Sequence, residues 1–472
     1  MTRGRNFHGL AEGDLLALAN VRYTSEIIDQ LTSAQFSRNA LLLEALRRGV
    51  VAAGYVTASG VIEAATALLS QAQADQPQLV RQLLVLPQFG LWAADCLISV
   101  QTAATSGQSL EPGTEHEIGY AAAFAATAGL LTGSPVDCLL PVRDGIAYLP
   151  ALAQVRLDDP TSSEWARLRS EGGGAAQLTV PGRRPTLFQL GNAPERTAGW
   201  ISVPRLQVRS RGLGLSVALG HSDPILSRLG PVSSALSPES IEAWHRGVGQ
   251  VWQVLTGDDH RFARALAAGL TALVPLQQPA GAPPTSAASG WAWGAIALTL
   301  PPDPLTFAET LIHEFQHLVL AAVEDIVPLA REDDKDLFYS PWRDDPRPFS
   351  SVLQGAYAFF AVADFWRKQG HARSPAVRRR AEDNFARQRR NVSDALAIVA
   401  EADRLSETGQ IFVRSMKERS AEWLADPVPA SAERLARQSS HEHRHRWRLA
   451  NTTPGQPPGE DSAIAEEPPG AT

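Results

Sequence analysis

Two histidines stand four residues apart in the apolar stretch ETLIHEFQHLVLAA, which runs from Glu309 to Ala322. On a helix, side chains four positions apart lie one above the other, so His313 and His317 project in nearly the same direction. Two imidazoles in that arrangement can bind one metal ion. Glu314 lies about 100° around the helix from His313, from where it can reach a metal-bound water. The pattern therefore indicates a metal site, with Glu314 as a catalytic carboxylate.

The residues around the two histidines are almost all apolar, which indicates that the helix is largely buried. These apolar neighbours are Leu311, Ile312, Phe315, Leu318, Val319 and Ala322. An unsatisfied polar group in such a place costs on the order of 1–3 kcal/mol. We favour a shared metal ion, which satisfies both rings, over two histidines that hydrogen-bond separately to their neighbours.

The histidine pair alone leaves the metal open. A zinc hydrolase needs a third protein ligand and a polarised water, with Glu314 as general base. A non-haem iron oxygenase needs two histidines and one carboxylate, with positions left open for a co-substrate and oxygen. Both kinds of metal site use His313 and His317 as ligands.

Two arginines follow the histidine helix in the segment YSPWRDDPRP. Arg343 and Arg347 each carry a planar guanidinium that can hold a carboxylate through two hydrogen bonds. The far carboxylate of 2-oxoglutarate is one such group. The alternative is that both arginines pair with Asp344, Asp345 or Glu324, and the sequence leaves this open.

The elements that position these residues predict an α+β fold that is mostly helical. Ala and Leu recur at helical spacing through residues 1–135. Residues 136–300 form a β-containing middle region, with antiparallel segments around Asp144-Gly145 and Gly212 and with helices over 237–275. A strand in WAWGAIALTL and then the histidine helix, in a zincin-like order, open a helical catalytic region over 301–450. The Pro- and Glu-rich residues 451–472 predict a disordered tail.

Cap residues predict where two of these helices begin. Ser237 precedes Pro238, and Asp303 precedes Pro304 at the start of the histidine helix. A Ser or Asp side chain can accept hydrogen bonds from the free N–H groups of the first turn, and proline suits that turn.

The segments AETLIHEFQHLVLAAVEDIVPL, YSPWRDDPRP and LQGAYAFFAVADFW resemble one known family. They are similar to the HExxH-motif proteins of ribosomal peptide natural-product clusters, the 2-oxoglutarate-dependent HExxH-type peptide β-hydroxylases. The resemblance implies iron(II) held by His313 and His317, 2-oxoglutarate and oxygen as co-substrates, and a ribosomally made precursor peptide as the partner that is hydroxylated. Glu314 matches the glutamate of the family's motif.

The third metal ligand is open at this point. Asp364, on the expected next helix, is our first choice, provided that helix packs back across the histidine helix. Asp325 is the second choice, although it lies about 12 Å beyond His317 along an unbroken helix.

The rest of the chain narrows the functional classes. A net charge of -7 over 472 residues gives no overall reason to expect nucleic acid as a partner. The sequence has no secretory signal and no long uncharged apolar run, so we expect a cytoplasmic protein without a membrane span. His441, His443 and His445 alternate with charged residues and predict a solvated surface.

Three functions remain. The first is an iron- and 2-oxoglutarate-dependent peptide hydroxylase. The second is a zinc metallopeptidase of gluzincin type. The third is a non-catalytic protein that binds a leader peptide through its helical N-terminal half.

Overall fold

The computed structural model describes residues 8–157, 165–190, 199–220, 223–233, 236–257, 260–279, 281–331 and 336–451. About 59% of the chain is helical and 16% is strand, which confirms the expected mixed and mainly helical class. The predicted tail at residues 452–472 lies outside the described residues.

Helices fill the N-terminal part, as the spacing of Ala and Leu predicts. They are α1 (Glu12–Ala19), α2 (Ser25–Ala52), α3 (Val56–Asp75), α4 (Pro77–Leu84), α5 (Pro87–Ser106), α6 (Pro112–Ile118) and α7 (Tyr120–Thr132). Helix α7, with the sequence YAAAFAATAGLLT, is buried along nearly its whole length. A helix that is apolar all round belongs in a core, and α7 packs between α3 and the first strand.

The first sheet has seven antiparallel strands. They are β1 (Val136–Arg143), β2 (Ile146–Leu149), β3 (Ala153–Arg156), β4 (Trp165–Gly172), β5 (Ala175–Thr179), β6 (Thr186–Gln189) and β7 (Trp200–Ser202). Their order in space is β6-β5-β4-β1-β2-β3-β7. The predicted hairpin is confirmed, because Asp144 and Gly145 both have positive φ, as the tight turn between β1 and β2 requires.

The second sheet carries the histidine helix. Its strands are β8 (Arg205–Ser210), β9 (Leu213–Leu219), β10 (Ala272–Pro275), β11 (Ser286–Ala287) and β12 (Ala295–Leu298), in the order β11-β12-β10-β9-β8. The short 3-10 helix η2 (Leu226–Leu229), α8 (Pro238–Leu255) and α9 (Arg261–Gly269) connect β9 to β10.

One expectation for this middle region is corrected and one is confirmed. The helical stretch ends at Gly269, and Ala272–Pro275 is a strand, because four consecutive buried apolar residues fit the centre of a sheet. The expected hairpin at Gly212 is confirmed by the antiparallel pair β8–β9, whereas β10 pairs in parallel with β9 and with β12.

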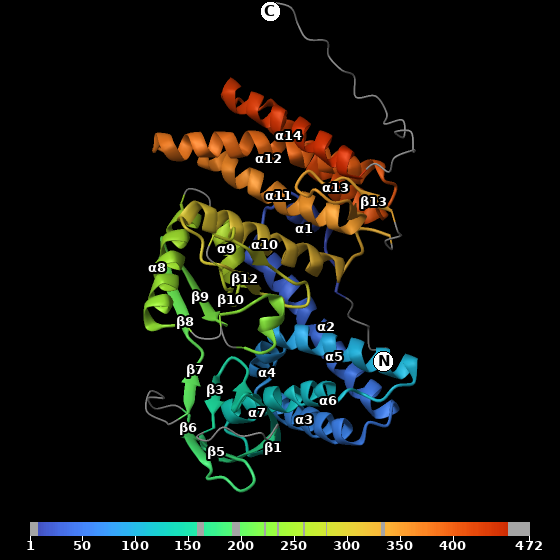
Figure 1. Cartoon of the computed structure of the whole chain (residues 1–472), viewed down its shortest axis with the longest axis vertical. Helices are drawn as coiled ribbons and strands as arrows, with labels where there is room; N and C mark the ends of the chain where they lie inside the picture. The colour runs from blue at the N-terminus through green and yellow to red at the C-terminus, as the bar shows by residue number, and fades with distance from the viewer. Residues whose placement is uncertain are drawn as a thin grey trace, which may run out of the picture.

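Helix α10 (Pro304–Glu324) holds the two histidines and follows β12 after a short connection. The Asp303 side chain accepts hydrogen bonds from the N–H groups of Leu305 (2.9 Å) and Thr306 (3.0 Å), which confirms the predicted cap. Ser237 caps α8 in the same way. Figure 1 shows α10 lying between the second sheet and the C-terminal helices.

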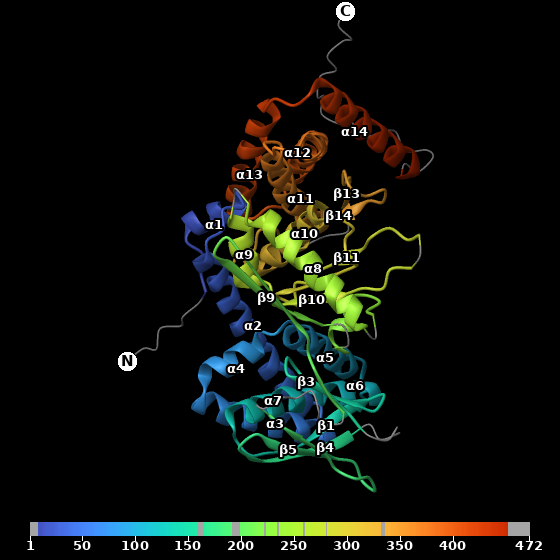
Figure 2. The same cartoon turned by 90° about the vertical axis from the view of Figure 1, so that its left-hand side faces the viewer.

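The C-terminal part begins with a two-stranded sheet and ends with four long helices. These elements are β13 (Leu337–Phe338), β14 (Arg347–Pro348), α11 (Phe349–Gln369), α12 (Pro375–Glu401), α13 (Glu407–Ala425) and α14 (Ala430–Asn451). Helices α11, α12 and α14 pack successively on α10 and on one another. In Figure 2, α14 lies at the outer edge of this group.

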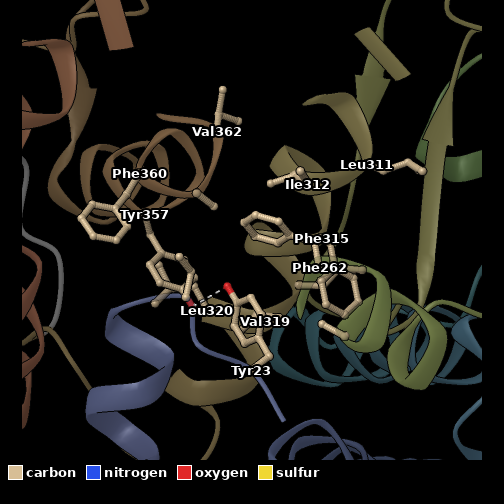
Figure 3. Close-up of a cluster of buried hydrophobic side chains, with 14 of the residues drawn as sticks. Tyr23, Phe262, Leu311, Ile312, Phe315, Val319, Leu320, Tyr357, Phe360 and Val362 are labelled. Carbon is tan, nitrogen blue, oxygen red and sulfur yellow. Dashed lines mark hydrogen bonds between the residues drawn. The ribbon is translucent and has the colours of Figure 1, made fainter. Parts of the chain in front are cut away.

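One hydrophobic core joins the N-terminal turn, the second sheet and the C-terminal helices around α10. Figure 3 shows its centre, where Phe315 and Val319 of α10 lie between Phe262 of α9 and Tyr357 of α11. Tyr23, from the connection between α1 and α2, enters the same cluster. The motif helix is therefore fixed by residues from both ends of the chain.

In the part of the chain that the structure describes, no single helix is long and apolar enough to cross a membrane. Helices α4 and α5 meet the length and hydropathy requirement only together, and they are bent by 63° at the break between them.

We expect Asp303→Ala to lower the free energy of unfolding by about 1 kcal/mol, because the first turn of α10 loses its cap. Urea unfolding of the purified protein measures this loss. Asp303→Asn is the matched control, since asparagine caps as well as aspartate does but gives up the ion pair with Arg380. Equal stability of Asp303→Ala and the wild type would contradict the assignment.

Candidate metal centre

The two histidines of α10 face one another. The Nε2 atoms of His313 and His317 are 3.1 Å apart, and the ring centroids are separated by 4.8 Å. Both side chains are partly exposed, whereas their neighbours Glu314, Phe315 and Gln316 are buried. The imidazoles therefore lie where the buried helix reaches the surface.

This arrangement fits a metal ion held by two imidazoles. Nitrogens that each lie about 2.0–2.1 Å from one tetrahedral zinc ion are about 3.3–3.4 Å apart. The 3.1 Å between the two Nε2 atoms differs from this by only a few tenths of an ångström. Burial, with a smaller contribution from neighbouring His317, lowers the pKa of His313 to about 3, so His313 is neutral at pH 7 and keeps a lone pair for a metal.

Glu314 is held by the edge of the second sheet. The residue is only 5% exposed, and its Oε1 accepts a 2.7 Å hydrogen bond from the hydroxyl of Ser286 on β11. Burial raises the pKa of Glu314, although the proximity of His317 and the bond from Ser286 both act to lower it. A carboxyl group with a raised pKa beside two imidazoles is suited to accept and return a proton.

Aromatic side chains form one wall beside His313. Phe359 of α11 meets the His313 ring edge-on at a centroid distance of 4.6 Å. Trp342, between β13 and β14, stacks on Phe359 at a centroid distance of 4.4 Å with an interplanar angle of 9°. Gly355 lies under the Trp342 ring, where a Cβ would be in contact at 3.5 Å. The segment after α10 is thereby attached to the histidine site.

The arginines expected to bind a co-substrate pair with a neighbouring carboxylate. The Nε atoms of Arg343 and Arg347 lie 3.6 Å and 3.1 Å from the two carboxylate oxygens of Asp345. This is one of the pairings that the sequence leaves open. Their role in binding 2-oxoglutarate stays a prediction.

Asp364, our first choice for the third ligand, points elsewhere in this structure. Its buried carboxylate forms an ion pair with Arg261 at the start of α9. Asp364 follows Phe359 by five residues on α11, and five residues turn a helix by about 140° from the starting direction. The side chain thus leaves α11 on a different face from the one that meets His313. As a metal ligand, Asp364 stays a prediction that this arrangement does not support.

Asp325, the second choice, is taken up by contacts with α2. It ends α10, is exposed, and accepts 2.9 Å hydrogen bonds from Arg38 and from Gln35. Across the described ranges, no three His, Cys, Asp or Glu side chains converge on one point. The two histidines fit a metal ion, but the structure does not bring a carboxylate to them as a third ligand.

Three residues near the histidines had no assigned role in the sequence. Ser286 contacts Glu314, and Phe359 packs on His313. The Oε1 atom of Gln354 lies 3.1 Å from Nδ1 of His317, within hydrogen-bond distance. The sequence carried no signal for Gln354 and Phe359, because side chains five residues apart on a helix point about 140° away from each other. Ser286 gave none, because its contact depends on how β11 pairs with β12.

The expectation of a solvated surface around the last histidines is wrong for His443. Its Nδ1 lies 2.8 Å from the hydroxyl of Tyr339, and only 15% of its side chain is exposed. His441 and His445, in contrast, are exposed. Helix α14 therefore packs on the segment that carries Trp342 and Arg343.

Comparison with models of known protein families and with curated proteins finds no match to this chain.

We expect Asp364→Asn to lower the free energy of unfolding by about 3 kcal/mol and to leave metal affinity unchanged, because it breaks a buried ion pair away from the histidines. Urea unfolding and metal titration measure the two effects. Asp345→Asn, which weakens an exposed pair, is the control and should cost less than about 1 kcal/mol. Lost metal binding at unchanged stability would instead make Asp364 a ligand.

The pKa of His313 predicts a pH-dependent stability. The unfolded chain protonates this ring below about 6.5, whereas the folded protein does so only below about 3. Between these values the unfolded state binds more protons, so the free energy of unfolding falls as the pH is lowered from about 6.5 towards about 3. We expect His313→Asn to reduce this dependence in urea unfolding of the metal-free protein. An unchanged slope would show that the ring is protonated normally.

Proposed function

We propose that this protein is an iron(II)- and 2-oxoglutarate-dependent oxygenase that hydroxylates the β-carbon of a residue in a ribosomally made precursor peptide. The observation that carries the proposal is the 3.1 Å approach of the Nε2 atoms of His313 and His317 at a partly exposed point of a buried helix. The choice of iron and 2-oxoglutarate rests on the resemblance of residues 308–366 to the peptide β-hydroxylases.

His313 and His317 would hold the iron. The bound metal, with 2-oxoglutarate and oxygen, supplies the oxidising power that converts a C–H bond into a C–OH group while the co-substrate becomes succinate and CO2. Phe359 and Trp342 keep water from one side of the site. Glu314, held by Ser286, can exchange a proton with a group bound beside the histidines.

The edge of the second sheet supports a peptide as the substrate. Strand β11 is the last strand on its side of the sheet, and Ser286 of this strand contacts Glu314 next to His313. An extended peptide can add to a strand edge through main-chain hydrogen bonds. A peptide added there would lie beside the strand whose Ser286 contacts Glu314, with its side chains alternating between the two faces of the sheet.

The contact of Arg343 and Arg347 with Asp345 supports a site for a carboxylate. The Nε atoms of both arginines lie near the exposed carboxylate of Asp345 in the segment that carries Trp342. The distal carboxylate of 2-oxoglutarate has the same chemistry and would compete with Asp345 for the two arginines.

A zinc metallopeptidase is the second candidate, and the position of Glu314 favours it. A buried glutamate with a raised pKa, directly after the first histidine, has the properties of a general base that deprotonates a metal-bound water. The same strand edge would then present the peptide bond that is cleaved.

Anaerobic reconstitution with iron(II) tests the oxygenase proposal. We expect a visible absorption band on addition of 2-oxoglutarate, and succinate after oxygen is admitted, with both lost in His317→Ala. Glu314→Gln separates the two enzyme classes, because it removes the base of a hydrolase but leaves both histidines. Zinc in the purified protein, with peptide cleavage that needs no oxygen and disappears in Glu314→Gln, would establish the peptidase. A protein that binds no metal and modifies no peptide would support the non-catalytic alternative.

A further inference from the structure

The two ring nitrogens of His317 have different partners. Nε2 faces His313 at 3.1 Å, and Nδ1 lies 3.1 Å from Oε1 of Gln354. Gln354 comes from α11 and is 37 residues further along the chain. An imidazole binds a metal through one nitrogen, and the hydrogen bond made by the other nitrogen determines which one is free.

The orientation of the Gln354 amide is fixed from its other end. Its Nε2 donates a 3.4 Å hydrogen bond to Oε2 of Glu324, in the last turn of α10. An ionised carboxylate can only accept, so the NH2 group of Gln354 must face Glu324 and its oxygen must face His317. This removes the ambiguity between the two ends of a glutamine amide.

The chain of hydrogen bonds then fixes the proton on His317. An amide oxygen has no proton to donate, so Nδ1 of His317 carries the hydrogen. The neutral ring therefore has its lone pair on Nε2, directed at Nε2 of His313. His313 is positioned differently, since the Phe359 ring packs against it.

We propose that Gln354 is a positioning residue that holds His317 in the tautomer able to bind a metal through Nε2, and that Glu324 orients Gln354 for this role. The inference rests on the proposed metal site and adds to it the groups that prepare His317. It also explains why half-buried positions beside His317 carry Gln354 on α11 and Glu324 on α10 instead of apolar residues.

The experiment is a titration of the full-length, metal-free protein with cobalt(II), followed by its visible absorption spectrum. We expect Gln354→Leu to weaken cobalt binding by about 10- to 100-fold, the loss that follows when the hydrogen-bond partner of a ligating histidine is removed. Gln410→Leu, at an exposed position of α13, is the matched control and should bind as the wild type does.

An exchange variant separates positioning from simple packing. In the double variant Glu324→Gln/Gln354→Glu the two side chains exchange places. The carboxylate at position 354 can then accept hydrogen bonds both from the amide at position 324 and from Nδ1 of His317. The acceptor that faces His317 is thereby restored. We expect this double variant to recover most of the affinity and the absorption spectrum that Gln354→Leu loses. Urea unfolding shows whether each variant is folded.

The outcomes are distinguishable. If the wild type binds cobalt and both Gln354→Leu and the exchange variant bind it equally well, the role of Gln354 is overturned and the proposed function stands. If the wild type binds no cobalt, both are overturned. Ring-15N-labelled histidine gives a second readout without metal, in which the proposal requires the hydrogen of His317 on Nδ1 in the wild type and its loss from that position in Gln354→Leu.

Discussion

Two imidazole nitrogens facing each other at 3.1 Å are the constraint around which this structure is arranged. Two lone pairs at that distance repel unless a proton or a metal ion lies between them. The rings can be held there only if the helix that carries them cannot rotate or slide. Helix α10 meets this condition because β12, α2, α8 and α11 all contact it and leave only the histidine face partly open.

Helix α11 makes two separate sets of contacts. Gln354 and Phe359 each contact one of the two histidines. Tyr357 and Asp364, which are seven residues apart and so leave α11 in nearly the same direction, lie in a buried group with Tyr23 and Arg261, where the Tyr357 hydroxyl donates to the carbonyl of Leu18 at 2.9 Å. Buried polar groups of this kind are stable only when they are satisfied, so the second group fixes the rotation of α11. That rotation in turn places Gln354 and Phe359.

The N-terminal part of the chain belongs to the same arrangement. Gln316, inside the histidine motif, accepts a hydrogen bond from Tyr23, and Figure 3 shows Tyr23 beside Tyr357 and Val319. Arg38 of α2 holds Asp325 at the end of α10. Gln316 and Asp325 thus connect α10 to Tyr23 and Arg38, which lie 293 and 287 positions earlier, and substitutions there should affect the site through the position of α10.

The sequence by itself determined the local features. The four-residue histidine spacing, the start of α10 at Asp303 and the turn at Asp144-Gly145 all follow from periodicity and backbone preferences, which depend on near neighbours. Only the tertiary structure decided which distant side chains meet the histidines. Asp364 and Gln354 lie ten residues apart on one helix, and the sequence favoured Asp364 as a ligand, yet Gln354 reaches His317 and Asp364 reaches Arg261. The physical reason is that the whole core sets how far along α11 and at what rotation it meets α10, and ten residues separate these two side chains by about 15 Å along the helix axis. The same holds for Ser286, whose contact with Glu314 depends on the register of β11 against β12.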